Sequence, residues 1–173
     1  ASFLLTLGFG AIVFAIVFLD LGETNHTRSS SMLAQLRTYP VLFRSRRFWG
    51  YTLTAAFTSS TFFAFLGGGP YVATEILGLR PSTYGLYFAL LSAGYMFGNF
   101  LSGRYARRIG INTMMLMGNV VSTAGMTLSL GLFYNGIDHA LALFGPVALV
   151  GIGNGLTLPS ANAGIVSVRP HLA

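Results

Sequence analysis

The sequence contains no cysteine, and only 8% of its 173 residues are charged. Without cysteine, neither a disulfide framework nor a thiolate metal site can form. Soluble domains carry roughly 25% charged residues, because charge covers a surface that faces water. With 53% hydrophobic residues and so little charge, the chain is expected to expose much of its surface to lipid, where charge is costly.

The net charge of +6 comes from ten basic residues, all of them arginine. Nucleic-acid-binding proteins gather basic residues in a patch or along one helix face. Here the arginines lie between apolar segments instead. We therefore expect no nucleic-acid partner.

The acidic and histidine side chains form no catalytic or metal-binding set. They lie at the ends of apolar segments, in connectors or in the tail: Asp20, Glu23, Glu75, Asp138, His26, His139 and His171. Metal-ligand spacing such as H-E-x-x-H is absent, as is the G-x-S-x-G elbow of serine hydrolases. The sequence therefore predicts no enzyme activity, no metal and no cofactor.

Long apolar segments are what the sequence does contain. A helix needs about 20 apolar residues to cross about 30 Å of hydrocarbon. Five segments have this length, which predicts an all-α integral membrane protein with five transmembrane helices: residues 1–20, about 48–79, about 84–103, about 111–134 and about 140–168. The alternative, a soluble helical bundle, requires polar helix faces, and "YFALLSAGYMFGNFLSG" has no charged face.

Residues 21–47 form the only long polar connector. Within it, "SSSMLAQLRTYPVLF" spaces its apolar residues as a helix lying on a membrane surface does, with an interruption near Pro40. The chain also begins inside one apolar run and ends just after another. We therefore expect it to be an internal piece of a longer protein.

The arginines define an orientation, because successive spans place successive connectors on opposite sides. Connectors 20–47 and 104–110 and the tail share one side, which holds all but one of the arginines: Arg28, Arg37, Arg44, Arg46, Arg47, Arg104, Arg107, Arg108 and Arg169. The other side holds only Arg80. Arginine accumulates on the cytoplasmic side of membrane proteins, so these connectors are predicted to be cytoplasmic.

Two kinds of residue within the segments are candidates for a transport pathway. The glycine–proline run Gly67, Gly68, Gly69 and Pro70 predicts a helix break, either beside a substrate site or as a simple bend at the membrane edge. Polar and aromatic side chains on the second and fifth segments predict a cavity wall: Tyr51, Thr54, Thr58, Phe62, Asn154 and Asn162. Hydrogen bonding between helices is the alternative for these polar groups. Small residues such as Gly94, Gly98, Gly118 and Gly125 predict close helix packing.

Three stretches, "LRTYPVLFRSRRFWGYTL", "RYARRIG" and "GNGLTLPSANAGIVSVRP", resemble the drug:proton antiporter group of the major facilitator superfamily, in particular its bicyclomycin-resistance branch. The resemblance implies that the segments are helices six to ten of a twelve-helix bundle. Residues 1–20 would end the N-terminal half, residues 21–47 would form the central cytoplasmic loop, and residues 48–173 would begin the C-terminal half.

The resemblance also implies a function. Such a protein exports lipophilic drugs across the bacterial inner membrane by proton antiport and alternating access. Its partners would be membrane lipid, a small lipophilic substrate, protons and the missing remainder of the same chain. Arg104, Arg107 and Arg108 match the basic positions of the family's cytoplasmic loop signature, which implies a clamp between helices, although Gly103 stands where the signature has an acid. A metabolite or sugar carrier and a non-transport polytopic membrane protein are the alternatives.

Overall fold

The computed structural model describes residues 2–20, 39–137 and 139–168. Every regular element within these ranges is helical, so the all-α prediction is confirmed for the described part. The chain divides into two compact units, residues 1–39 and 40–173. Several predictions concern residues outside the described ranges: the connector up to residue 38 with the start of its surface helix, and Arg28, Arg37, Arg169, Glu23, Asp138, His26 and His171.

The first unit contains helix α1, Ser2–Asp20. Its sequence has no charged residue before Asp20, and the side chains of residues 3–19 are all exposed. A helix that is apolar on every side requires either other helices or lipid around it. The apolar run Phe3–Leu19 is shorter than the other candidate spans.

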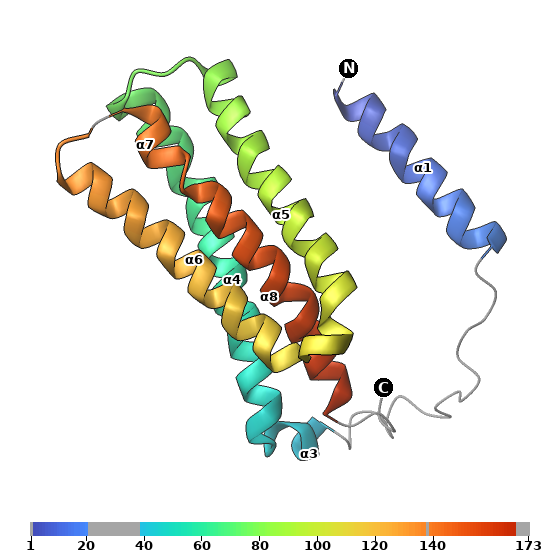
Figure 1. Cartoon of the computed structure of the whole chain (residues 1–173). Helices are drawn as coiled ribbons and strands as arrows, with labels where there is room; N and C mark the ends of the chain where they lie inside the picture. Colours follow the sequence, from blue (N-terminus) through green and yellow to red (C-terminus); the bar gives the residue numbers. More distant parts are fainter. Residues whose placement is uncertain (1, 21–38, 138, 169–173) are drawn as a thin grey trace. The chain divides into compact units, whose positions relative to one another are not determined.

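The second unit is a bundle of long helices. Its elements are α3 (Tyr39–Phe43, beginning at the unit boundary), α4 (Arg46–Tyr71), the π-helical turn η1 (Val72–Ile76), α5 (Pro81–Ile109), α6 (Ile111–Tyr134), α7 (Ala140–Phe144) and α8 (Val147–Ser167). Figure 1 shows α8 between α5 and α6, with α4 behind them. Helix α8 is therefore the centre of the bundle.

Two segments of the described chain are long and apolar enough to cross a membrane by length and composition: Ile111–Tyr134 and Ala140–Ser167. Helices α4 and α5 are longer than α6, but their serines, threonines, glycines and terminal arginines lower their hydropathy. The count of five spans, the twelve-helix bundle and the division into 1–20, 21–47 and 48–173 stay predictions. The predicted span 140–168 contains two helices, α7 and α8, because Gly145 and Pro146 lie between them.

The predicted helix break at Gly67–Pro70 is wrong, because α4 continues through all four residues to Tyr71. Proline lacks an N–H group and its ring crowds the carbonyl four residues earlier. The chain adapts by widening the helix directly afterwards into η1, where the Leu77 N–H donates to the Val72 carbonyl at 3.0 Å. A π-helical turn of this kind absorbs the mismatch without ending the helix.

The predicted connector 104–110 is also corrected. Helix α5 extends to Ile109, so Arg104, Arg107 and Arg108 lie in its last two turns and not in a loop. Cationic side chains are stabilised near the C-terminus of a helix by its dipole. Only Gly110, with φ 89°, separates α5 from α6, and glycine adopts this backbone conformation without a side-chain clash.

Glycines set the spacing between α8 and its two main neighbours. A Cβ atom on Gly94 or Gly98 of α5 would collide with the carbonyl oxygen of Ala148 or Ile152 of α8. On the other side, a Cβ atom on Gly118 of α6 would lie 2.6 Å from the Gly153 carbonyl oxygen, and one on Gly125 would lie 2.7 Å from that of Pro146. The predicted role of these glycines in close helix packing is confirmed.

Candidate functional site

Asn154 is the polar residue at the centre of the bundle. It lies on α8 with only 3% of its surface exposed, and its Oδ1 accepts a hydrogen bond from the Ser122 hydroxyl of α6 at 3.3 Å. A buried amide requires such partners because desolvation without a hydrogen bond is costly. Three separate cavities border Asn154, so it is the one side chain that all three share.

The first cavity lies between α4 and α6 and measures about 470 Å³. Hydroxyl and amide side chains dominate its lining, together with three large apolar residues: Thr54, Phe57, Thr58, Thr61, Asn119, Ser122, Thr123, Met126, Thr127, Leu130 and Asn154. The hydroxyls of Thr54 and Thr61 donate to carbonyls of their own helix, four residues earlier, at 2.8 and 3.1 Å. This wall is uncharged and is the most polar of the three, although apolar atoms still make up most of its surface.

The second cavity lies between α4 and α5, measures about 440 Å³, and is mainly aromatic and apolar. Its lining comprises Ser59, Phe62, Phe63, Phe88, Leu91, Ser92, Tyr95, Met96, Gly151, Asn154 and Leu158. The rings of Phe62 and Phe88 are 6.4 Å apart. An aromatic wall beside a single buried amide suits an apolar molecule that needs one polar contact for orientation.

The third cavity measures about 330 Å³ and continues from Phe62 toward α7. Phe65 and Phe144 form part of its wall, and their rings meet edge to face with centroids 5.9 Å apart. Phe62 therefore borders two of the three cavities, and Asn154 borders all of them. All three volumes fall in the range of small-molecule sites, about 300–1,000 Å³.

The structure separates the six predicted cavity residues into two groups. Thr54, Thr58, Phe62 and Asn154 line the cavities around the centre of α8. Tyr51 and Asn162 line none of these three cavities. The Tyr51 ring instead packs against Gly164 and its hydroxyl donates to Asn112 Oδ1 at 2.8 Å, while Asn162 is exposed.

Sequence reasoning missed the aromatic residues of α5. Phe88 and Tyr95 line the second cavity together with Phe63 of α4. Their spacing of seven residues places Phe88 and Tyr95 on one face of a helix, which is the signal that was available. Sequence alone does not show whether such a face lines a cavity or meets lipid, because aromatic residues occur on both kinds of surface.

All the described arginines of the second unit except Arg80 gather at one end of it. Arg46 and Arg47 begin α4, and Arg104, Arg107 and Arg108 end α5; Figure 1 shows these two helix ends at the same end of the bundle. In residues 39–137 and 139–168 the only carboxylate is that of Glu75 in η1, which lies at the opposite end. No carboxylate of residues 39–137 and 139–168 is therefore close enough to pair with Arg104, Arg107 or Arg108. That these arginines clamp two helices together stays a prediction.

Comparisons with known proteins agree with the helical architecture. The family model described as Major Facilitator Superfamily matches residues 1–173. The chain is 28% identical over 128 residues to the uncharacterized MFS-type transporter YdgK of Bacillus subtilis, covering 68% of this chain and 32% of that protein. It is 27% identical over 110 residues to a bicyclomycin resistance protein homolog of Haemophilus influenzae, covering 61% of this chain and 27% of that protein.

A third relative, an uncharacterized transporter of Rickettsia bellii, is 25% identical over 160 residues, covering 87% of this chain and 40% of that protein. The chain thus spans less than half the length of these relatives. No solved structure matches it. Because the family model covers every residue, the chain belongs to the major facilitator superfamily of transporters.

Proposed function

We propose that this chain is part of a secondary active transporter that exports lipophilic drugs in exchange for protons. The placement of Asn154, beside the aromatic second cavity at the centre of the bundle, is the observation that carries the proposal. The similarity to a bicyclomycin resistance protein homolog supports the same class of substrate. We place the protein in the bacterial inner membrane, with the arginine-rich end in the cytoplasm.

The lining of the second cavity supports lipophilic cargo over a charged solute. Phe62, Phe88 and Tyr95 offer ring faces and edges to a ligand, and no charged side chain lines the cavity. A solute with a carboxylate or phosphate would leave its charge without a partner at this wall, which costs several kcal/mol. The remainder of the protein would supply the opposite wall and the proton-carrying acids.

The experiment uses the full-length protein in a drug-sensitive bacterial strain. Phe62→Ala and Asn154→Ala should change the pattern of resistance across a panel of lipophilic drugs while membrane expression holds. Asn135→Ala is the matched control, because Asn135 is the same residue type but is exposed just after the end of α6 and lines none of the three cavities. Unchanged resistance to every drug in both cavity variants would contradict the proposal.

Proton coupling is tested separately in inverted membrane vesicles. Adding a transported drug to energised vesicles should partly collapse the pH gradient, because each exported molecule would release protons from the acidified interior. The collapse should weaken in Phe62→Ala and Asn154→Ala vesicles. Drug movement that is unaffected when an uncoupler abolishes the gradient would exclude proton antiport.

The hydroxyl-lined first cavity favours a second candidate, a carrier of an uncharged polar metabolite. Thr54, Thr58 and Thr61 on α4 face Asn119 and Thr123 on α6 across that space. Thr58→Val keeps the shape of the side chain and removes its hydroxyl. If Thr58→Val abolishes transport while Phe62→Ala leaves it unchanged, the metabolite carrier replaces the drug exporter.

A further inference from the structure

A compact elbow, which we define as residues 40–49, joins α3 to α4. The indole N–H of Trp49 donates to the carbonyl oxygen of Phe43 at 2.8 Å, so the first turn of α4 holds the end of α3. The rings of Phe43 and Trp49 lie 5.9 Å apart, and Phe48 meets both at 6.0 and 6.1 Å. Three aromatic rings therefore form one cluster at the start of α4.

The backbone of the elbow is fixed by hydrogen bonds of its own. The Ser45 N–H donates to the Leu42 carbonyl at 2.9 Å, and the Ser45 hydroxyl accepts from the Phe48 N–H at 3.4 Å as the N-cap of α4. An N-cap of this kind defines where a helix starts. These hydrogen bonds hold the backbone on either side of Ser45 in one conformation, which fixes where the neighbouring side chains begin.

Three of those side chains are exposed arginines: Arg44, Arg46 and Arg47. A hollow of about 460 Å³ opens beside them, lined by Pro40, Val41, Arg44 and Ser45. No carboxylate of residues 39–137 and 139–168 lies at this end of the bundle, because the only one, that of Glu75, follows the far end of α4. The positive charge of the elbow is thus not neutralised by any carboxylate of residues 39–137 and 139–168.

The aromatic cluster is only partly covered. Trp49 is 43% exposed and Phe43 is 53% exposed, so each presents an apolar face as well as a hydrogen-bonded backbone. Tryptophan and other aromatic residues concentrate at the boundary between lipid tails and headgroups. An aromatic cluster at that boundary would hold the neighbouring arginines at the depth of the headgroup phosphates.

We infer that the elbow binds the headgroup phosphate of anionic phospholipids, with Arg44, Arg46 and Arg47 as its ligands and Trp49 as its anchor in the interface. A guanidinium group donates two parallel hydrogen bonds to a phosphate, and each arginine near an anionic surface strengthens binding roughly fivefold. The inference rests on the membrane location that the family implies and is independent of which compound is transported.

Trp49 is itself the probe, because it is the only tryptophan of the 173 residues. The full-length protein, with any tryptophan outside these residues changed to phenylalanine, is reconstituted in vesicles that contain brominated phosphatidylglycerol or brominated phosphatidylcholine. Bromine quenches the fluorescence of a nearby indole. We expect the anionic lipid to be enriched around Trp49 by about fivefold or more over the zwitterionic lipid.

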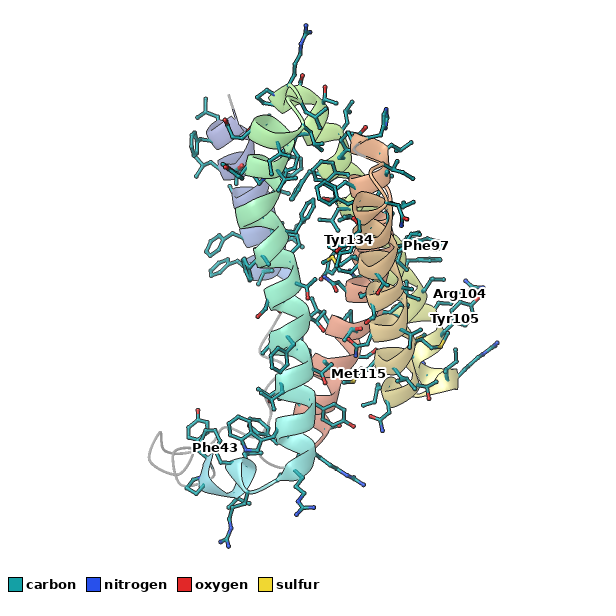
Figure 2. All side chains as sticks on the ribbon, turned by 90° about the vertical axis from the view of Figure 1, so that its left-hand side faces the viewer. Phe43, Phe97, Arg104, Tyr105, Met115 and Tyr134 are labelled. Carbon is teal, nitrogen blue, oxygen red and sulfur yellow. The ribbon has the colours of Figure 1, made fainter. Side chains whose placement is uncertain are left out.

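Three sets of substitutions test which arginines carry the preference. Replacing Arg44, Arg46 and Arg47 with glutamine should lower it to about twofold or less, while replacing them with lysine should keep most of it. The matched control replaces Arg104, Arg107 and Arg108 with glutamine, which removes the same charge from the end of α5. Figure 2 shows Phe43 of the elbow well separated from Arg104, so this control should retain the preference.

Two results would overturn the inference. The first is equal quenching by both lipids in the protein that keeps all of its arginines. The second is a preference that is lost only when Arg104, Arg107 and Arg108 are replaced. Native mass spectrometry of the unmodified full-length protein, counting retained phosphatidylglycerol against phosphatidylcholine, provides a second measurement that requires no substitution. Circular dichroism of each variant checks that the helices are intact. Neither lipid measurement requires a drug, so loss of the lipid preference and loss of drug export are distinguishable.

Discussion

The hydroxyl of Tyr51 donates a hydrogen bond to Oδ1 of Asn112 at 2.8 Å, across 61 positions of sequence. Tyr51 lies in the second turn of α4 and Asn112 in the first turn of α6. The Tyr51 ring also packs against Gly164 near the end of α8. Three helices are thus joined by one tyrosine at the end of the bundle that carries most of the arginines.

Tyr51→Phe removes this hydrogen bond and keeps the ring contact with Gly164. We expect it to lower the free energy of unfolding of the full-length protein in detergent by about 1 kcal/mol. Asn112→Ala should cost a similar amount, and the double variant should cost little more, because the two side chains share one interaction. Tyr134→Phe is the control, since Tyr134 is 95% exposed. A double variant whose cost equals the sum of the two would contradict the contact.

Gly98→Ala tests the close approach of α5 to α8. The added methyl group would meet the carbonyl oxygen of Ile152, and backbone moves only at a cost, so we expect destabilisation of about 1–3 kcal/mol. Gly85→Ala, in the same helix, has no atom within 4 Å of the new Cβ and should be neutral or stabilising by up to about 1 kcal/mol. Thermal unfolding in detergent measures both. Equal effects of the two substitutions would contradict the packing.

Gly69 and Tyr84 form a second pair. A Cβ atom on Gly69 would lie 2.7 Å from the Tyr84 hydroxyl oxygen, which is buried and has no hydrogen-bond partner among the described residues. We expect Gly69→Ala to destabilise the protein by about 1–3 kcal/mol, and Tyr84→Phe to relieve much of that loss in the double variant. Gly68→Ala is the control, because its Cβ meets nothing within 4 Å. A Gly69→Ala variant as stable as Gly68→Ala would contradict the close contact between Gly69 and Tyr84.

The orientation is tested by placing single cysteines at the two ends of α5. Cysteine is absent from these 173 residues; any elsewhere in the full-length protein is first replaced by serine. In intact cells, a membrane-impermeant maleimide should label Arg80→Cys, whereas Arg107→Cys should react only after the membrane is opened. Labelling of Arg107→Cys in intact cells would reverse the orientation.

The sequence was sufficient for the features that depend on local spacing. Gly94 and Gly98 predict close packing because they share one helix face, and the structure places both against the α8 backbone. Asn154 was predicted as a polar group that needs a partner, and it has one in Ser122. The family was also recognisable, because "GNGLTLPSANAGIVSVRP" and the basic stretches resemble its members.

What depends on neighbours far along the chain was not predictable. Tyr51 and Thr58 lie on one face of α4 by spacing, yet only the packing of α6 and α8 puts Thr58 at a cavity and Tyr51 on Gly164. The run Gly67–Pro70 predicts a break from propensity alone, but a π-helical turn after Pro70 preserves the helix. That compensation involves Val72–Ile76, whose residue types carry no signal of a widened turn.

The glycine contacts of α8 also determine which helices can move. Where backbone meets backbone with no side-chain layer between them, as at Gly98 and Gly118, one helix has no room to slide along the other, so α5, α6 and α8 should travel as a rigid block. Helix α4 meets α5 through the rings of Phe62, Phe65 and Phe88, and rings can re-stack at small cost. Any movement within this part of the protein should therefore be a tilt of α4 about its arginine-rich end, where Tyr51 holds it to α6 and α8.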